Sequence, residues 1–444
     1  MSAMGSLFSA KKPAESYILL IMLFFFSNAA WTLEVGVAAR EITPDVKEYR
    51  VPMAGYGARG GNPSQGVHDP LKAKALVFRD GSKQMALITT DLRSITPQFK
   101  AQIVQKASSL GFRKDNVFVC ASHTHAGPSM YPEPFWQIQF GKFDPAIVQS
   151  MSDQVAAALR EAAENATAAN VGFGSMAVEG FTANRRWEVD NESRIASGEK
   201  PQTDPFLRLL RVDDTTGAMK ALVVLFATHP TIGGADNFLL SAEWPGVLQR
   251  TIETMCEGTI ALFCNGAVGD QRPIGASGED AFERIEDFGG RLAAKAVHLA
   301  STVQTLPDQR ISYAHDHPPL PPITYSPKAL KGPFAFLAEL GKEQLPKRAE
   351  LQLLAIGDVV LAGLPGEPLC AVGQAVCDSL QNIGFGNVLV IGLANDYVGY
   401  IVTEEEYAHG GYEVDHRSFY GPELGDFMVR ETAKLAHRIA PTRP

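Results

Sequence analysis

The chain has 444 residues, of which 45% are hydrophobic and 20% are charged, and its formal net charge is −9. This is a globular composition, and the length suffices for one large α/β catalytic domain or for two or three ordinary domains. No long basic run offsets the negative charge, which excludes nucleic acid as a partner.

The N-terminus has the pattern of an export signal. Lys11 and Lys12 precede YILLIMLFFFSNAAWT, whose apolar part is shorter than the ~20 residues of a membrane-spanning helix. The small residues from Ser27 to Ala30 offer a cleavage region. We therefore expect residues 1–30 to be a signal peptide or, alternatively, an uncleaved membrane anchor. Either predicts a secreted, periplasmic or cell-envelope protein.

Strand-like and helix-like patterns alternate along the rest of the chain. Residues 74–80 and 84–92 flank an Asp-Gly turn and predict a β-hairpin. Helical periodicity follows at 96–112 and 145–166, and apolar strands are predicted within 170–181, 221–230, 259–270 and 351–367. This alternation predicts an α/β fold of mixed β-sheets layered with helices, in a single large catalytic domain over residues 31–444.

Two features leave alternatives open. Residues 315–333 are rich in proline and form either an internal boundary or a loop over one domain. The five cysteines include no CxxC pair and are too few for a disulfide scaffold. They are compatible with one disulfide, but the sequence does not select the pair.

Reactive side chains follow several of the predicted strands. In NVFVCASHTHAGPSM, His123 and His125 are two residues apart, so on a strand both imidazoles face the same side. His229 and Glu367 follow two further apolar strands, at the position where open α/β sheets bind ligands. Two imidazoles and a carboxylate are a recurrent zinc set. The same spacing also fits a surface histidine pair, a core histidine before proline and an ordinary Pro-Gly-Glu turn.

Eight motifs then link the chain to a known family: ITPDV, MAGYG, SHTHAGP, NRR, THP, NGAVGD, LPGEP and NDYVGYIVTEEEYAHGGYE. In these motifs and their order, the chain resembles the catalytic domain of the neutral ceramidase family, non-lysosomal amidases that cleave the N-acyl bond of ceramide. The sequence ends soon after the last motif. The resemblance therefore implies a short form without the C-terminal immunoglobulin-like domain of longer members.

The resemblance implies a zinc-dependent amidohydrolase. The expected Zn²⁺ ligands are His123, His229, Glu367 and Tyr400, and the expected catalytic residues are His125, Arg185 and Tyr412. In this scheme zinc-activated water attacks the amide, Arg185 and Tyr412 stabilise the oxyanion, and His125 passes a proton to the leaving amine. The alternatives are a packed aromatic at Tyr412 and a surface ion pair of Arg185 with Glu188 or Asp190.

Arg272 departs from the family pattern, which has a serine at this position of the motif. Arginine cannot accept an acyl group, so we expect water and not a serine to be the nucleophile. Arg272 is predicted either to bind the substrate, with a preference for an anionic one, or to pair with Asp270.

The expected substrate is ceramide or a related N-acyl lipid, which is compatible with association at a membrane surface. One alternative is a zinc amidase or esterase that acts on a non-lipid substrate, since the same centre supports that chemistry. Another is a non-catalytic lipid or carbohydrate binder on the same scaffold. The sequence predicts no oligomeric state.

Overall fold

The computed structural model describes residues 32–81, 83–188, 194, 198–329 and 341–441. The predicted signal peptide or anchor at residues 1–30 lies outside this part of the chain. Among the described residues, no helix combines the length and the apolar character needed to cross a membrane.

The larger of two sheets contains eight strands in the order β11-β9-β8-β6-β1-β3-β4-β5. Its strands are β1 (Glu34–Glu41), β3 (Lys72–Asp80), β4 (Lys83–Thr90), β5 (Val117–Ala121), β6 (Thr167–Ala177), β8 (Phe206–Asp214), β9 (Met219–Phe226) and β11 (Ile260–Asn265). The β3–β4 hairpin turns at Gly81, whose φ of 61° is left-handed, as predicted for the Asp-Gly turn.

The second sheet has four strands in the order β13-β14-β15-β17. They are β13 (Ile311–Asp316), β14 (Leu351–Ile356), β15 (Val359–Gly363) and β17 (Asn387–Ile391). Three short pairs complete the strands: β2 (Gly66–Val67) with β10 (Leu239–Leu240), β7 (Thr182–Asn184) with β12 (Gln271–Pro273), and β16 (Glu367–Pro368) with β18 (Tyr400–Ile401).

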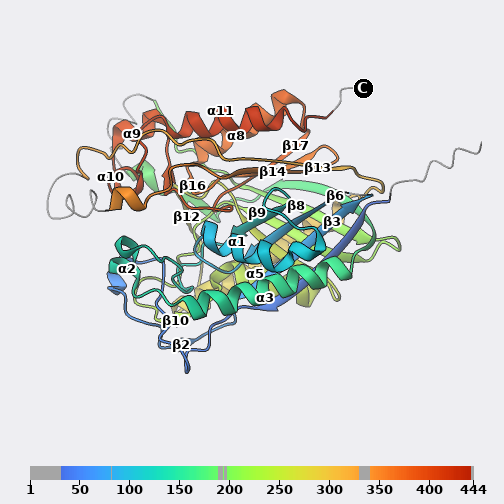
Figure 1. Cartoon of the computed structure of the whole chain (residues 1–444), viewed down its shortest axis with the longest axis horizontal. Helices are drawn as coiled ribbons and strands as arrows, with labels where there is room; N and C mark the ends of the chain where they lie inside the picture. The colour runs from blue at the N-terminus through green and yellow to red at the C-terminus, as the bar shows by residue number, and fades with distance from the viewer. Residues whose placement is uncertain (1–31, 82, 189–193, 195–197, 330–340, 442–444) are drawn as a thin grey trace, which may run out of the picture. The chain divides into compact units, whose positions relative to one another are not determined.

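The helices cover the outer faces of the two stacked sheets (Figure 1). The larger ones are α1 (Pro97–Ala107), α3 (Pro145–Glu164), α5 (Glu243–Met255), α6 (Ala281–Thr302), α8 (Cys370–Ile383) and α11 (Leu424–Ala436). The shorter ones are α2 (Pro134–Phe140), α9 (Glu404–His409), α10 (Tyr412–Arg417) and the 3-10 turns η1 (Gly57–Arg59), η2 (Ser108–Leu110), η3 (Arg185–Glu188) and η4 (Lys342–Gln344).

Alternating side chains explain why the layers stack in this order. On β14, Leu354 and Ile356 join the apolar cluster between the sheets, whereas Leu353 and Ala355 join the cluster under α8 and α11. Other clusters lie between the large sheet and the helices α1, α3, α5 and α6. Each sheet is thus buried on both faces. The predicted α/β class, with mixed sheets layered with helices in one domain, is confirmed.

Three parallel strand pairs prepare the site. They are β4–β5, β9–β11 and β15–β17, joined by α1, α5 and α8 respectively. His123 follows β5, His229 follows β9 and Glu367 follows β15. These residues therefore lie beyond the carboxyl ends of parallel strands, which is where the sequence predicts them.

A buried ion pair joins α1 to the smaller sheet. Lys100 is 1% exposed and donates to Glu350, just before β14, and to Gln352 at 3.0 Å. His315 on β13 lies 3.0 Å from the same Glu350 oxygen. Burial opposes the charge on Glu350, but the contacts with His315 and Lys100 lower its pKa to about 2. The contact therefore stabilises the packing of the layers only while Glu350 is ionised.

We predict that Lys100→Met lowers the free energy of unfolding by about 3–5 kcal/mol, because it leaves a buried carboxylate without its partner. Lys100→Met/Glu350→Leu should lose less than the single variant. Lys347→Ala, which removes an exposed pair with Glu343, is the matched control and should cost less than about 1 kcal/mol. Denaturant unfolding measures all three.

The same experiment has a defined pH window. The unfolded carboxyl titrates near pH 4.3, above the folded pKa of about 2, so this stabilisation is present above about pH 5 and is lost as the pH falls toward 2. The wild type should lose more stability than the double variant in that window. An equal loss would contradict the role of the pair.

Candidate functional site

His123 is held in an unusual backbone conformation directly after β5. Its φ is +73°, a left-handed value that costs free energy for a non-glycine residue, and its side chain is fully buried. Its backbone N–H donates to Leu92 O at 2.9 Å, and its Nδ1 donates to Arg93 O at 2.7 Å. The loop after β4 therefore fixes both the turn and the ring.

His229 lies on the loop after β9 and is oriented in the same way, by a backbone carbonyl of β12. Its Nδ1 donates to Gln271 O at 2.9 Å. Since a carbonyl oxygen only accepts, the hydrogen of each ring sits on Nδ1, and each Nε2 carries a lone pair. Both Nε2 atoms lie 3.2 Å from Oε2 of Glu367. Two imidazole lone pairs and a carboxylate oxygen thus converge without a donor between them.

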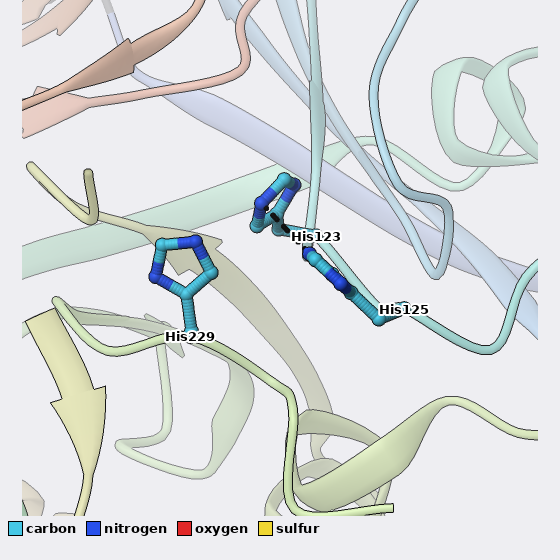
Figure 2. A group of neighbouring side chains, drawn as sticks. All are labelled: His123, His125 and His229. Carbon is cyan, nitrogen blue, oxygen red and sulfur yellow. Dashed lines mark hydrogen bonds between the residues drawn. The ribbon is translucent and has the colours of Figure 1, made fainter. Parts of the chain in front are cut away.

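His125 brings a third imidazole to the same point, as Figure 2 shows with His123 and His229. Its Nε2 is 3.2 Å from Nε2 of His123, and one nitrogen from each of the three rings lies within 4.8 Å of the others. Its Nδ1 is buried without a hydrogen-bond partner. Burial lowers the pKa of His229 to about 4 and that of His125 well below its usual value, so both are neutral at pH 7.

These residues fit a metal ion. Acceptor atoms about 3 Å apart repel one another unless a cation lies among them, and the available donors are the nitrogen and oxygen ligands that zinc takes in proteins. Backbone carbonyls that accept from Nδ1 are the usual outer partners of metal-binding histidines. The observation that most favours a metal site is that the acceptor atoms of His123, His229 and Glu367 lie together with no hydrogen-bond donor between them.

Glu367 is fixed through its other oxygen by two residues that the sequence analysis missed. Tyr397 donates to Oε1 at 2.6 Å, and Arg93 donates to the Tyr397 oxygen at 2.9 Å. Arg93 also lies 3.7 Å from Oε1. A signal for both was present, since Tyr397 belongs to NDYVGY and Arg93 follows the strand β4.

Tyr400 lies beside Glu367 because the two are register partners in the parallel β16–β18 pair. Its oxygen accepts a hydrogen bond from Arg185 at 2.8 Å. Burial raises the pKa of Tyr400 well above its usual value, and Arg185 opposes that rise. Arg185 itself is held by Glu413 at 2.8 Å. Arg185 therefore has its partners within the site. The predicted alternative was a surface ion pair with Glu188 or with Asp190, and Asp190 lies outside the described residues.

Tyr412 lies at the edge of the site. It is 51% exposed, and its ring centroid is 6.2 Å from that of Tyr400. Arg186, fully buried, anchors the segment before it by donating to Glu413, to Glu406 and to the Gly410 carbonyl at 2.7–2.8 Å. The structure thus brings all seven predicted ligands and catalytic residues to one place, with Tyr412 outermost.

Arg272, the remaining predicted site residue, lies on β12. It is exposed, between the buried Gln271 and the partly buried Pro273. Asp270, its predicted alternative partner, accepts hydrogen bonds from the side chains of Gln271 and Asn184 and from the backbone of Cys370. Both alternatives for Arg272, substrate binding and an ion pair with Asp270, therefore remain predictions.

Comparison with known proteins identifies the family. A family model described as neutral/alkaline non-lysosomal ceramidase, N-terminal, matches residues 33–283 and 321–428. The family is one of hydrolases, so the match places the chain in the hydrolase class. The chain belongs to the neutral/alkaline non-lysosomal ceramidase family. The resemblance seen in the sequence motifs is thereby confirmed.

The individual relatives have low sequence identity to this chain but align with most of its length. A neutral ceramidase of Mycobacterium tuberculosis is 24% identical over 93% of this chain and 78% of its own. Neutral ceramidase A of Dictyostelium discoideum is 22% identical over 91% and 72%. The crystal structure of the Pseudomonas aeruginosa neutral ceramidase superimposes with a TM-score of 0.80 at 20% identity, over 93% of this chain and 76% of that one. At this identity the superposition shows the shared fold.

We predict that Tyr397→Phe lowers metal affinity about 10–100-fold, because outer partners of metal ligands contribute that much. Competition with a chromogenic chelator measures the affinity for added Zn²⁺. Tyr313→Phe, on the distant strand β13, is the control and should bind as the wild type does. Equal affinities for all three proteins would remove Tyr397 from the metal centre.

Proposed function

We propose that the chain is a zinc-dependent amidohydrolase that cleaves the N-acyl amide bond of ceramide or a related lipid, giving an amine and a fatty acid. The observation that carries this is the convergence of the His123 and His229 Nε2 atoms on one Glu367 oxygen with no donor between them. The names of the relatives, all neutral ceramidases, support the choice of bond and substrate.

In this proposal the zinc ligands are His123, His229, Glu367 and Tyr400. These four residues would hold the ion, and the chemistry it would supply there is polarisation of a substrate carbonyl and a water pKa lowered to about 7. The protein supplies the ligand geometry in advance, because a carbonyl of the loop after β4 fixes the imidazole of His123 and a carbonyl of β12 fixes that of His229. Pre-orientation of this kind avoids reorganisation during the reaction.

Three residues around the ligands have distinct roles. Arg185 presents a permanent cation beside Tyr400, where it stabilises the negative charge that develops on the amide oxygen. Tyr412 is exposed toward solvent and is free to donate a second hydrogen bond to that oxygen. His125 has an unpartnered Nδ1, which suits it to hold a proton for the leaving amine.

A groove next to Tyr412 supports a lipid substrate. Its volume is about 350 Å³, and its walls include the rings of Phe135, Tyr325, Tyr412 and Phe419 together with Leu345. Apolar walls of this kind accommodate hydrocarbon, and the groove begins where the proposed reaction centre ends. The groove favours the lipid over a non-lipid substrate, and the complete set of ligands favours an enzyme over a non-catalytic binder.

Export and surface association complete the proposal. The basic and apolar pattern of residues 1–30 supports a secreted, periplasmic or cell-envelope location. A lipid amide substrate is compatible with association of the enzyme at a lipid surface. Arg272 retains its two proposed roles, and water remains the proposed nucleophile.

The metal assignment predicts about one zinc per chain in the purified protein. His123→Ala and His229→Ala should each lose most of it, since each removes a ligand. His125→Ala should keep its zinc while its turnover falls about 10²–10⁴-fold. His298→Ala, on the exposed face of α6, controls for loss of a histidine. Unchanged zinc content in both ligand variants would contradict the proposed metal site.

The groove predicts a dependence on acyl-chain length. Tyr325→Ala should lower kcat/KM for a long-chain N-acyl substrate about 10-fold more than for a short-chain one, because only the long chain loses buried contact area. Phe206→Ala, an exposed aromatic on β8, is the control. A fluorogenic substrate series measures both. The same loss on short and long chains would refute the role of the groove.

A further inference from the structure

Two cysteines without a role in the proposed chemistry lie in contact inside the protein. Cys120 is near the end of β5 and Cys264 is near the end of β11. Both side chains are fully buried, and their Sγ atoms are 3.7 Å apart. Each residue belongs to the apolar cluster between the two sheets. The two thiols therefore face each other across a fixed and crowded interior.

The contact joins the two ends of the large sheet. β5 and β11 are its opposite edge strands, yet the side chain of Asn265 crosses between them to Ser122 O at 2.9 Å and to Thr228 O at 3.3 Å. Ser122 directly precedes His123, and Thr228 directly precedes His229. A covalent bond at this point would tie together the segments that present the two histidines.

The other three cysteines do not offer an equivalent pair. Cys370 and Cys377 are seven positions apart on α8, which places them about 10 Å apart along the axis. A disulfide requires Cα atoms within about 7 Å. Cys256 lies at the end of α5 and is partly exposed. The geometry thus selects one pair among the five cysteines.

We infer that Cys120 and Cys264 form a disulfide. Each Sγ needs to move by less than about 1 Å to reach the S–S bond length of about 2.05 Å. The oxidant is a disulfide, either glutathione disulfide or the disulfide of a folding catalyst. During folding, before the interior closes, one cysteine attacks it and releases a first thiol, and the second cysteine then displaces the remaining half, so two electrons and two protons pass to the oxidant.

The test refolds the denatured full chain in glutathione buffers from fully reduced to fully oxidised, so that both thiols meet the oxidant before the interior closes around them. Free thiols are alkylated under denaturing conditions and the digest is analysed by mass spectrometry. Alkylatable cysteines should fall from five to three, and a peptide linking Cys120 to Cys264 should appear. Five alkylated cysteines in the most oxidising buffer, or a link between other cysteines, would overturn the inference.

Two variants and a stability measurement sharpen the result. Cys256→Ser should still give the linked peptide, with two cysteines left to alkylate. Cys264→Ser should give none. The oxidised wild type should have a Tm at least about 5 °C above the reduced form, because the bond closes a long loop, and Cys264→Ser should show no such difference. An equal Tm for both wild-type forms would contradict a bond that braces the sheet.

Discussion

The site depends on one electrostatic constraint: three buried acceptor atoms occupy a space that only a cation makes favourable. His123 and His229 each direct an Nε2 lone pair at the same oxygen of Glu367. The ring hydrogens of His123 and His229 do not relieve this repulsion, because both are committed to backbone carbonyls. A cluster of this kind is a candidate functional site, because such an arrangement is unfavourable without a bound cation.

The surrounding structure is arranged to hold those acceptors in place. Arg93 contributes twice, since its carbonyl orients His123 and its guanidinium binds the tyrosine that holds Glu367. Arg185 and Arg186 play the matching part on the other side, where they bind Glu413 and so link η3 to the start of α10. Buried arginines with several fixed partners are suited to this task because the guanidinium is planar and always charged.

The sequence predicted the part of the site that follows from strand periodicity. His123, His229 and Glu367 each come just after an apolar strand, and parallel strands end at the same edge of a sheet. Which strands share a sheet was not predictable, since buried strands of both sheets show the same apolar runs. The roles of Arg93 and Tyr397 were missed because 304 residues separate the two partners. The Cys120–Cys264 contact could not be predicted for the same reason, because the two cysteines are 144 positions apart in the sequence.

Each of the three parallel pairs supplies one residue of the acceptor cluster, so the proposed metal site depends on all three of them. The ligands lie at positions 123, 229 and 367, so no short segment of the chain can assemble the centre by itself. Loosening any one of the three units separates a ligand from the others. In the proposed metalloenzyme, metal binding is therefore coupled to the cooperative folding of the whole domain, and free metal would stabilise the fold by mass action.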